Sequence, residues 1–211
     1  DQWGNILTGN ELIRRLEGGE SYALTTPLIT KSDGGKFGKT EDGNVWLDEN
    51  KTSPYKFYQF WINVSDEDAK VFIKIFTQKS NNEIKKLIIN HDKEPHLRII
   101  QNALAEEITE IVHDKEKLNI AKSTSSVLFG KFLKEDFDNL EEKVMESLST
   151  AVPCVTIKRD NLLNDFKTIL TESTNFEIFK SKSELVRMIK NNGLSINKDK
   201  INNEDYIISD N

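Results

Sequence analysis

Apolar residues recur at helical spacing along most of the chain, with a shorter run of a different kind near its start. The spacing predicts an amphipathic helix over residues 5–17, ended by Gly18 and Gly19. Residues 21–30 form a short apolar run without the helical period, which predicts a buried strand. The glycine-rich stretch 31–44 that follows predicts a loop.

From Thr52 onward the pattern predicts a bundle of helices. Ser53 before Pro54, then Ser65, and then Ser80 with Glu83 are typical helix starts. Longer apolar patterns predict a helix from Leu97 to Val112 and two more over 115–128 and 136–148. The aromatic run 55–61 predicts core packing.

Pro153 interrupts this pattern, and we place a linker near 148–158. Beyond it, Asp160 is expected to cap a helix that runs to Leu170, and Ser181 with Glu184 predicts a capping box. That second helix should stop at residues 191–193. A short strand over 194–197 should follow, with a turn at 198–200.

Composition limits the classes of protein that fit. The 211 residues allow one or two domains, and the net charge of −6 argues against a general nucleic-acid coat. One cysteine, Cys154, excludes an internal disulfide framework and fits a reducing compartment. No apolar run approaches the roughly 20 residues of a membrane span, and no signal peptide opens the sequence. The Met-less start suggests a chain that begins inside a domain.

The loop holds the candidate chemistry. Lys36 and Lys39 flank Phe37 and Gly38, and the hydroxyl of Thr40 follows. Two flexible ammonium groups beside a glycine backbone suit a polyphosphate and can stabilise charge on a leaving pyrophosphate. The glycine spacing of a Walker loop is absent. From spacing alone, an ordinary solvated turn is the better interpretation.

Several motifs in order change that interpretation. The segment 36–40 resembles the lysine signature of class I aminoacyl-tRNA synthetases in its bacterial tyrosyl form, Lys-Phe-Gly-Lys-Ser/Thr. Segments 1–5, 28–34, 46–48 and 52–61 resemble the same family in the same order, and 104–107 and 112–113 continue the match. The resemblance covers essentially the whole chain, closest over 1–63 and looser after 130.

The resemblance implies roles for individual residues. Asp1 would bind the ribose of ATP and of the adenylate, and Gln2 would lie near the tyrosyl carboxyl and the α-phosphate. Leu28 and Ile29 would line the adenine pocket. The mobile signature loop, which grips pyrophosphate, would supply Lys36, Lys39 and Thr40. We expect Trp3 to pack in the core beside the site.

Some family features are missing. The family's early histidine pair and tyrosine pocket are absent, so we expect a C-terminal portion of a synthetase that does not activate tyrosine alone. His91, His96 and His113 lack the spacing of a metal site. We expect His91 and His96 at the surface and His113 at a helix end. No protein-bound metal is predicted.

Residues 176–200 carry six cationic residues against three carboxylates. The capped helix and short strand there resemble the alphaL RNA-binding motif that ends bacterial tyrosyl-tRNA synthetases. The resemblance implies that basic side chains contact the tRNA backbone, namely Lys180, Lys182, Arg187 and Lys190. We expect the motif to be truncated, because the family has further strands after a position like Asn211. A solvated basic helix face is the alternative.

Together these features predict an α/β class I synthetase portion. Residues 1–53 would end a Rossmann-like catalytic domain, 54–150 would form a helical anticodon-binding domain, and 158–211 an α+β RNA-binding domain. The implied activity is tyrosine–tRNA ligation through tyrosyl-adenylate, with ATP and its Mg²⁺, tyrosine and tRNA as substrates. The resemblance also implies a homodimeric, cytoplasmic parent enzyme without membrane contact. A non-catalytic RNA-binding module and the related tryptophanyl enzyme are the alternatives.

Overall fold

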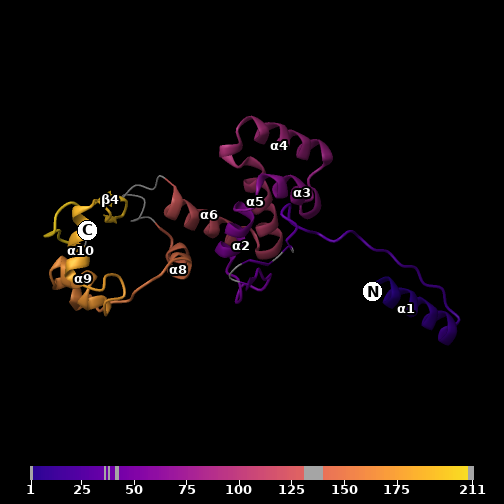
Figure 1. The fold of residues 1–211 in the computed structure, drawn as a ribbon, viewed down its shortest axis with the longest axis horizontal. Helices are drawn as coiled ribbons and strands as arrows, with labels where there is room; N and C mark the ends of the chain where they lie inside the picture. The colour runs from indigo at the N-terminus through magenta and orange to yellow at the C-terminus, as the bar shows by residue number, and fades with distance from the viewer. Residues whose placement is uncertain (1, 36, 38, 41–42, 131–139, 209–211) are drawn as a thin grey trace. The chain divides into compact units, whose positions relative to one another are not determined.

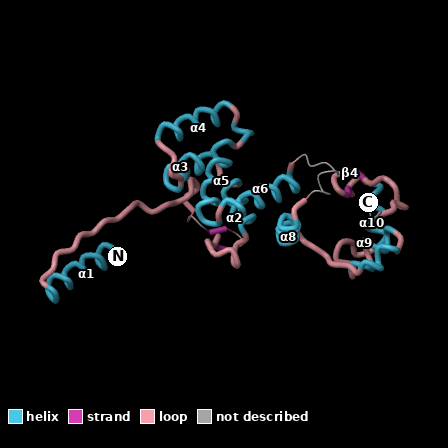
Figure 2. The backbone as a smooth tube through the Cα atoms, turned by 180° about the vertical axis from the view of Figure 1, so that it is seen from behind, coloured by secondary structure: helices cyan, strands magenta, loops and turns pink. Residues whose placement is uncertain are grey.

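The computed structural model of the chain describes residues 2–35, 37, 39–40, 43–130 and 140–208. The chain divides into two compact units, Asp1–Asn44 and Val45–Asn211. Helix is the main secondary structure, and strand occurs only in short segments (Figure 2). Over the described ranges the strands form two antiparallel pairs and no parallel sheet. The described part of the chain is therefore mostly helical, which differs from the expected α/β architecture.

The first unit opens with α1 (Gln2–Glu17). Glu11 pairs with Arg14 and Arg15 one turn later, at 2.7 and 2.6 Å, and Gly18 ends the helix at a φ of +66°. No described residue of α1 is buried. The expectation that Trp3 packs in a core is wrong, since 56% of its surface is exposed. Within the described part of this unit, the apolar side chains of α1 are not packed into a core.

The strand expected over 21–30 is also wrong. The segment lacks regular structure apart from an isolated bridge at Thr30, and both Tyr22 and Leu24 are 91% exposed. An apolar run becomes a strand only where a neighbouring strand accepts its backbone hydrogen bonds. The residues described around this segment provide no such neighbour.

The second unit begins with the predicted bundle of helices, labelled in Figure 1. They are α2 (Pro54–Ile62), α3 (Asp66–Phe76), α4 (Asn81–Lys93), a 3₁₀ turn (Pro95–Leu97), α5 (Ile99–His113), α6 (Lys115–Phe129) and α8 (Glu142–Ala151). The predicted caps are confirmed: the hydroxyls of Ser53 and Ser65 accept from the third backbone amide beyond them, and Ser80 forms a full capping box with Glu83. The start of the helix predicted over 136–148 lies outside the described residues.

The core of the bundle is built around α2, which packs against both α5 and α6. The predicted burial of the aromatic run is confirmed for Tyr55, Phe57, Tyr58 and Trp61. The Trp61 ring lies edge-on to Phe72 of α3 with centroids 6.3 Å apart, so the aromatic cluster also ties α3 to α2. Apolar side chains of α5 and α6 complete the core, among them Ile100, Leu104, Ala105, Leu118 and Ala121.

Two of the three histidines lie inside this bundle. The expectation of a surface His91 is wrong: the side chain is 1% exposed, and its Nε2 lies 3.2 Å from Asp66 Oδ1. His91 stands seven residues after buried Ile84, so the helical period places it on the inner face of α4. His113 ends α5 as predicted, packs edge-on against Phe57 with centroids 4.8 Å apart, and burial lowers the pKa of its imidazole. His96 is exposed, as expected.

We name residues 159–208 the C-terminal lobe. It contains a 3₁₀ turn (Arg159–Leu163), α9 (Phe166–Leu170), a second 3₁₀ turn (Glu172–Thr174), α10 (Lys182–Lys190) and the paired strands β3 (Ser195–Ile196) and β4 (Asp199–Lys200). Its core is formed by Phe166, Phe179, Leu185, Ile189 and Ile201. The lobe therefore has an apolar core of its own that joins both helices to the segment after β4.

Three local predictions in the lobe need correction. Asp165, not Asp160, caps the helix, because its carboxylate accepts from the amides of Lys167 and Thr168. Ser181 caps α10, but Glu184 accepts from the amide of Lys180 instead of closing the box on Ser181. The strand turns at residues 197–198, both at positive φ, and residues 199–200 form its partner strand.

Replacing Phe57 by alanine should lower the free energy of unfolding by about 3–5 kcal/mol, because it removes a buried ring that contacts both Trp61 and His113. Urea unfolding followed by circular dichroism measures this. The exposed Phe129, changed to alanine, is the matched control and should shift the value by less than about 0.5 kcal/mol. Equal losses for both variants would contradict the proposed role of the α2 core.

Candidate functional site

The loop that carries the lysine signature begins with a tight turn. The amide of Lys31 donates to the Gly35 carbonyl at 3.0 Å, and the amide of Gly34 donates to the Lys31 carbonyl at 3.0 Å. Gly34 has a φ of +82°, and the carboxylate of Asp33 accepts from the Gly35 amide at 2.7 Å. The turn therefore needs glycine at position 34 and an acceptor at position 33.

The signature itself leads into a short hairpin. Strand β1 (Lys39–Thr40) pairs antiparallel with β2 (Gly43–Asn44), and Lys39 lies opposite Asn44. Lys36 lies outside the described residues, so the structure does not test its role. The hairpin gives the backbone of the second lysine and of Thr40 a defined partner strand.

The other predicted nucleotide-binding residues are spread along the first unit. Asp1 lies outside the described residues. Gln2 begins α1 and is exposed, while Leu28 is 81% exposed and Ile29 partly exposed in the segment beyond Gly18. Gln2 and Leu28 are both exposed, and they lie on different segments of the unit. Their roles remain predictions.

The segment that follows the hairpin is fixed to the helical bundle. Glu49 pairs with Lys117 of α6, and the Trp46 amide donates to the hydroxyl of buried Thr52 at 3.0 Å. The ammonium of Lys51 lies 4.3 Å from the centre of the Trp46 ring. The sequence motifs at 46–48 and 52–54 marked this segment, but the partner on α6, almost seventy residues away, had no sequence signal.

A cavity of about 490 Å³ lies where the start of α2 faces α6 and α8. It is lined by Pro54, Tyr55, Lys117, Lys143 and Thr150 among others. Lys117 pairs with Glu49 and Lys143 with Glu116, so both ammonium groups already have carboxylate partners. None of the predicted site residues lines this cavity.

The four residues predicted to contact RNA lie on or just before α10, and two of them pair with carboxylates. Lys182 pairs with Glu172 at 2.9 Å and donates to the Thr168 hydroxyl at 2.9 Å. Lys190 pairs with Glu204 at 3.5 Å. Lys180 and Arg187 are exposed, and the guanidinium of Arg187 donates to a backbone carbonyl of its own helix at 3.4 Å.

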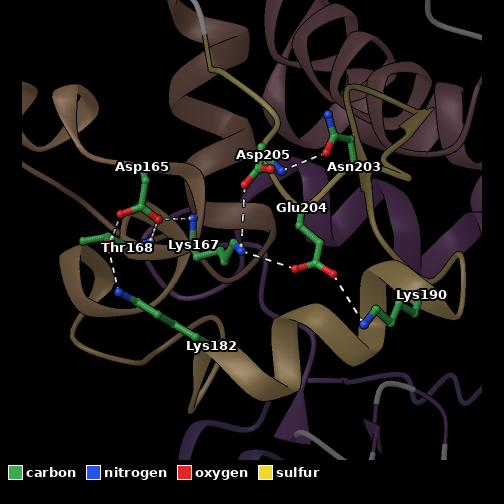
Figure 3. A network of polar contacts seen from close by, with 8 residues as sticks. All are labelled: Asp165, Lys167, Thr168, Lys182, Lys190, Asn203, Glu204 and Asp205. Atoms are coloured by element: carbon green, nitrogen blue, oxygen red, sulfur yellow. Dashed lines mark hydrogen bonds and ion pairs between the residues drawn. The ribbon is translucent and has the colours of Figure 1, made fainter.

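Glu204 has a second cationic partner. Figure 3 shows its carboxylate between Lys167 of α9 and Lys190 of α10. The ammonium of Lys167, which donates to it at 3.3 Å, lowers the pKa of the Glu204 carboxyl. Glu172 in turn raises the pKa of Lys182. These shifts favour the charged forms of the Glu204 carboxylate and the Lys182 ammonium.

Within the described ranges, His, Cys, Asp and Glu side chains form no group of three or more that could hold a metal ion. The helices of the same residues include none with the length and apolar character needed to cross a membrane.

Known proteins resemble this chain closely. The family model for class I tRNA synthetases (W and Y) matches residues 1–130. A protein of Bacteroides fragilis (strain YCH46) named tyrosine–tRNA ligase is 49% identical over 99% of this chain and 49% of its own length. One from Porphyromonas gingivalis (strain ATCC 33277), with the same name, is 48% identical over 100% of this chain and 50% of its own. The chain thus spans about half the length of the curated relatives it matches.

Among solved structures, a C-terminally truncated mitochondrial tyrosyl-tRNA synthetase of Coccidioides posadasii is 31% identical. The likeness covers 58% of this chain and 36% of that one, with a TM-score of 0.49.

Replacing Gly34 by alanine should loosen the turn before the signature, because a left-handed backbone costs a residue with a side chain about 1–2 kcal/mol. We expect the Lys31 amide, which closes the turn, to exchange with solvent roughly tenfold faster. Amide exchange followed by NMR measures this. Gly4 to alanine in α1, where nothing lies within 4 Å of the added methyl, should leave the rate unchanged; unchanged exchange in the Gly34 variant would show that the turn tolerates a side chain.

Proposed function

The chain belongs to the class I tRNA synthetases for tryptophan and tyrosine, and from this membership we propose that it is part of a tyrosine–tRNA ligase. The observation that carries the proposal is the identity of nearly half of all positions with tyrosine–tRNA ligases over 99% of the chain. The family model covers the tryptophan enzymes as well, but the relatives named here attach tyrosine. Tyrosine is therefore the proposed amino acid.

The proposed reaction has two steps. The tyrosine carboxylate attacks the α-phosphorus of ATP, which enters with its Mg²⁺, and pyrophosphate leaves as tyrosyl-adenylate forms. A terminal hydroxyl of tRNA then attacks the tyrosyl carbonyl, and AMP leaves. Neither step needs a covalent enzyme intermediate, so catalysis consists of positioning and electrostatic stabilisation.

In this proposal the signature loop acts on the leaving pyrophosphate. Lys36 and Lys39 would place positive charge where negative charge develops, with the hydroxyl of Thr40 as a donor. Asp1 would hold the ribose, Gln2 the α-phosphate region, and the backbone at Leu28 and Ile29 the adenine. The Gly34 turn and the β1–β2 hairpin support this assignment, since they give the loop two defined backbone segments.

The domain assignment follows the same reasoning. Residues 1–53 would complete a Rossmann-like catalytic domain, 54–150 would recognise the anticodon, and 158–211 would bind the tRNA backbone. The separate apolar cores around α2 and in the C-terminal lobe support the last two. The complete protein would be a cytoplasmic homodimer, and tRNA would be its macromolecular partner.

In the full-length protein, Lys39→Ala should lower tyrosine-dependent ATP–pyrophosphate exchange by about 100-fold, because one donor to the transition state is lost. Lys36→Ala should act in the same direction. Lys85→Ala on the exposed face of α4 is the control and should leave the rate unchanged. If both signature variants kept full exchange activity while the chain still bound tRNA, a non-catalytic RNA-binding module would be the better proposal.

Reversing charge at Lys180 and Arg187 together, each to glutamate, should weaken binding of a tyrosine tRNA transcript by about tenfold at about 50 mM salt. Fluorescence anisotropy over a salt series measures both affinity and its salt slope, which should become shallower. Lys85→Glu reverses one charge on α4 and should have a much smaller effect. Unchanged affinity at low salt would remove the C-terminal lobe from the tRNA interface.

A further inference from the structure

The carboxylate of Glu204 lies between two lysines of the C-terminal lobe, Lys167 and Lys190. One oxygen accepts from Lys167 at 3.3 Å, and the other lies 3.5 Å from the ammonium of Lys190 (Figure 3). Asp205 adds a second carboxylate 3.9 Å from Lys167. A phosphate approaching this end of α10 therefore meets a site that is already occupied by an anion.

The segment that carries Glu204 is held in place by contacts that do not depend on charge. Ile201 is buried in the core of the lobe, and Ile208 packs against it. The Tyr206 ring lies edge-on to Phe166, with centroids 5.3 Å apart, and the side chain of Asn203 accepts from the Asp205 amide at 3.0 Å. Glu204 is thus a preplaced anion, and it does not need to be ordered when Lys190 binds it.

The two ends of α10 differ in what they offer to a phosphate. The side chain of Lys190 is 68% exposed and that of Glu204 is 35% exposed, so RNA can reach the lysine but still meets the negative charge beside it. Among the described residues, the Arg187 guanidinium has a long hydrogen bond of 3.4 Å to a backbone carbonyl of its own helix and no carboxylate partner. Exposed ion pairs are weak, so the lysine can exchange partners, but the fixed carboxylate continues to repel the phosphate.

We propose that Glu204 is an internal competitor of RNA phosphate that lowers the affinity of the C-terminal lobe for tRNA and makes that affinity less dependent on salt. The proposal rests on the proposed binding of tRNA by this lobe. In this proposal Lys180 and Arg187 make most of the direct contacts with phosphate. Lys190 and Lys167 contact phosphate only when they leave the Glu204 carboxylate. A synthetase must release its charged tRNA, and a built-in competing anion favours release.

The test is Glu204→Gln in the 211-residue chain, with binding of a labelled tyrosine tRNA transcript measured by anisotropy over a salt series. We expect affinity to rise about two- to fivefold at about 50 mM salt. The salt slope should steepen by about 0.7–0.9, the value for one additional phosphate contact. The gain should shrink when Lys190→Gln is added, because the released ammonium is then missing.

Two control variants isolate the charge. Glu204→Asp keeps the negative charge and should keep the wild-type affinity, whereas a gain equal to that of the glutamine variant would assign the effect to a loosened segment and overturn the proposal. Glu177→Gln removes an exposed carboxylate of the same lobe and should change affinity much less. Thermal unfolding followed by circular dichroism confirms that each variant is folded.

The Lys180 and Arg187 reversal separates the two proposals. If that reversal weakens binding while Glu204→Gln leaves it unchanged or weaker, the competitor proposal is wrong and tRNA binding by the lobe stands. If the reversal has no effect at low salt, tRNA binding by the lobe has failed, and the competitor proposal fails with it.

Discussion

The helical part of the protein depends on the burial of one aromatic face of α2. This helix is only nine residues long, too short to be stable alone in water, so its structure comes from packing. Phe57 and Trp61 supply that packing against His113 and against Phe72. Because α2 contacts both α5 and α6, it joins the two longest helices of the bundle.

The same burial explains the behaviour of the polar groups around it. His113 lies against Phe57, where desolvation lowers the pKa of the imidazole and so favours its neutral form inside the core. His91 lies equally deep, beside the Asp66 carboxylate. Both histidines are therefore part of the packed core of the bundle.

Local signals in the sequence predicted the helix starts of the bundle well, but they were less accurate in the C-terminal lobe, where Asp165 and not Asp160 is the cap. They also failed where structure depends on distant residues. The hydroxyls of Ser53, Ser65 and Ser80 correctly marked helix starts, because a cap involves only the next three residues. The apolar run at 21–30 resembled a strand, but a strand needs a partner that the described residues do not supply. The same limit applies to the candidate sites: basic residues on α10 were found by composition, yet Glu204 comes beside Lys190 only because the β3–β4 turn returns the chain.

The local charge that each surface of this protein presents depends on tertiary ion pairs and not on the net charge. The net charge of −6 argued against nucleic-acid binding, and the excess of basic residues near the end argued for it. The structure divides those basic residues further, since Lys182 and Lys190 pair with carboxylates, whereas Arg187 donates to a backbone carbonyl of its own helix. The chain is also restrained on both sides of the signature loop. The Gly34 turn precedes the signature, and the Glu49–Lys117 pair follows it. Preorganised positive charge stabilises a developing anion best, so restraints on the backbone on either side of the loop would support the proposed role of its lysines.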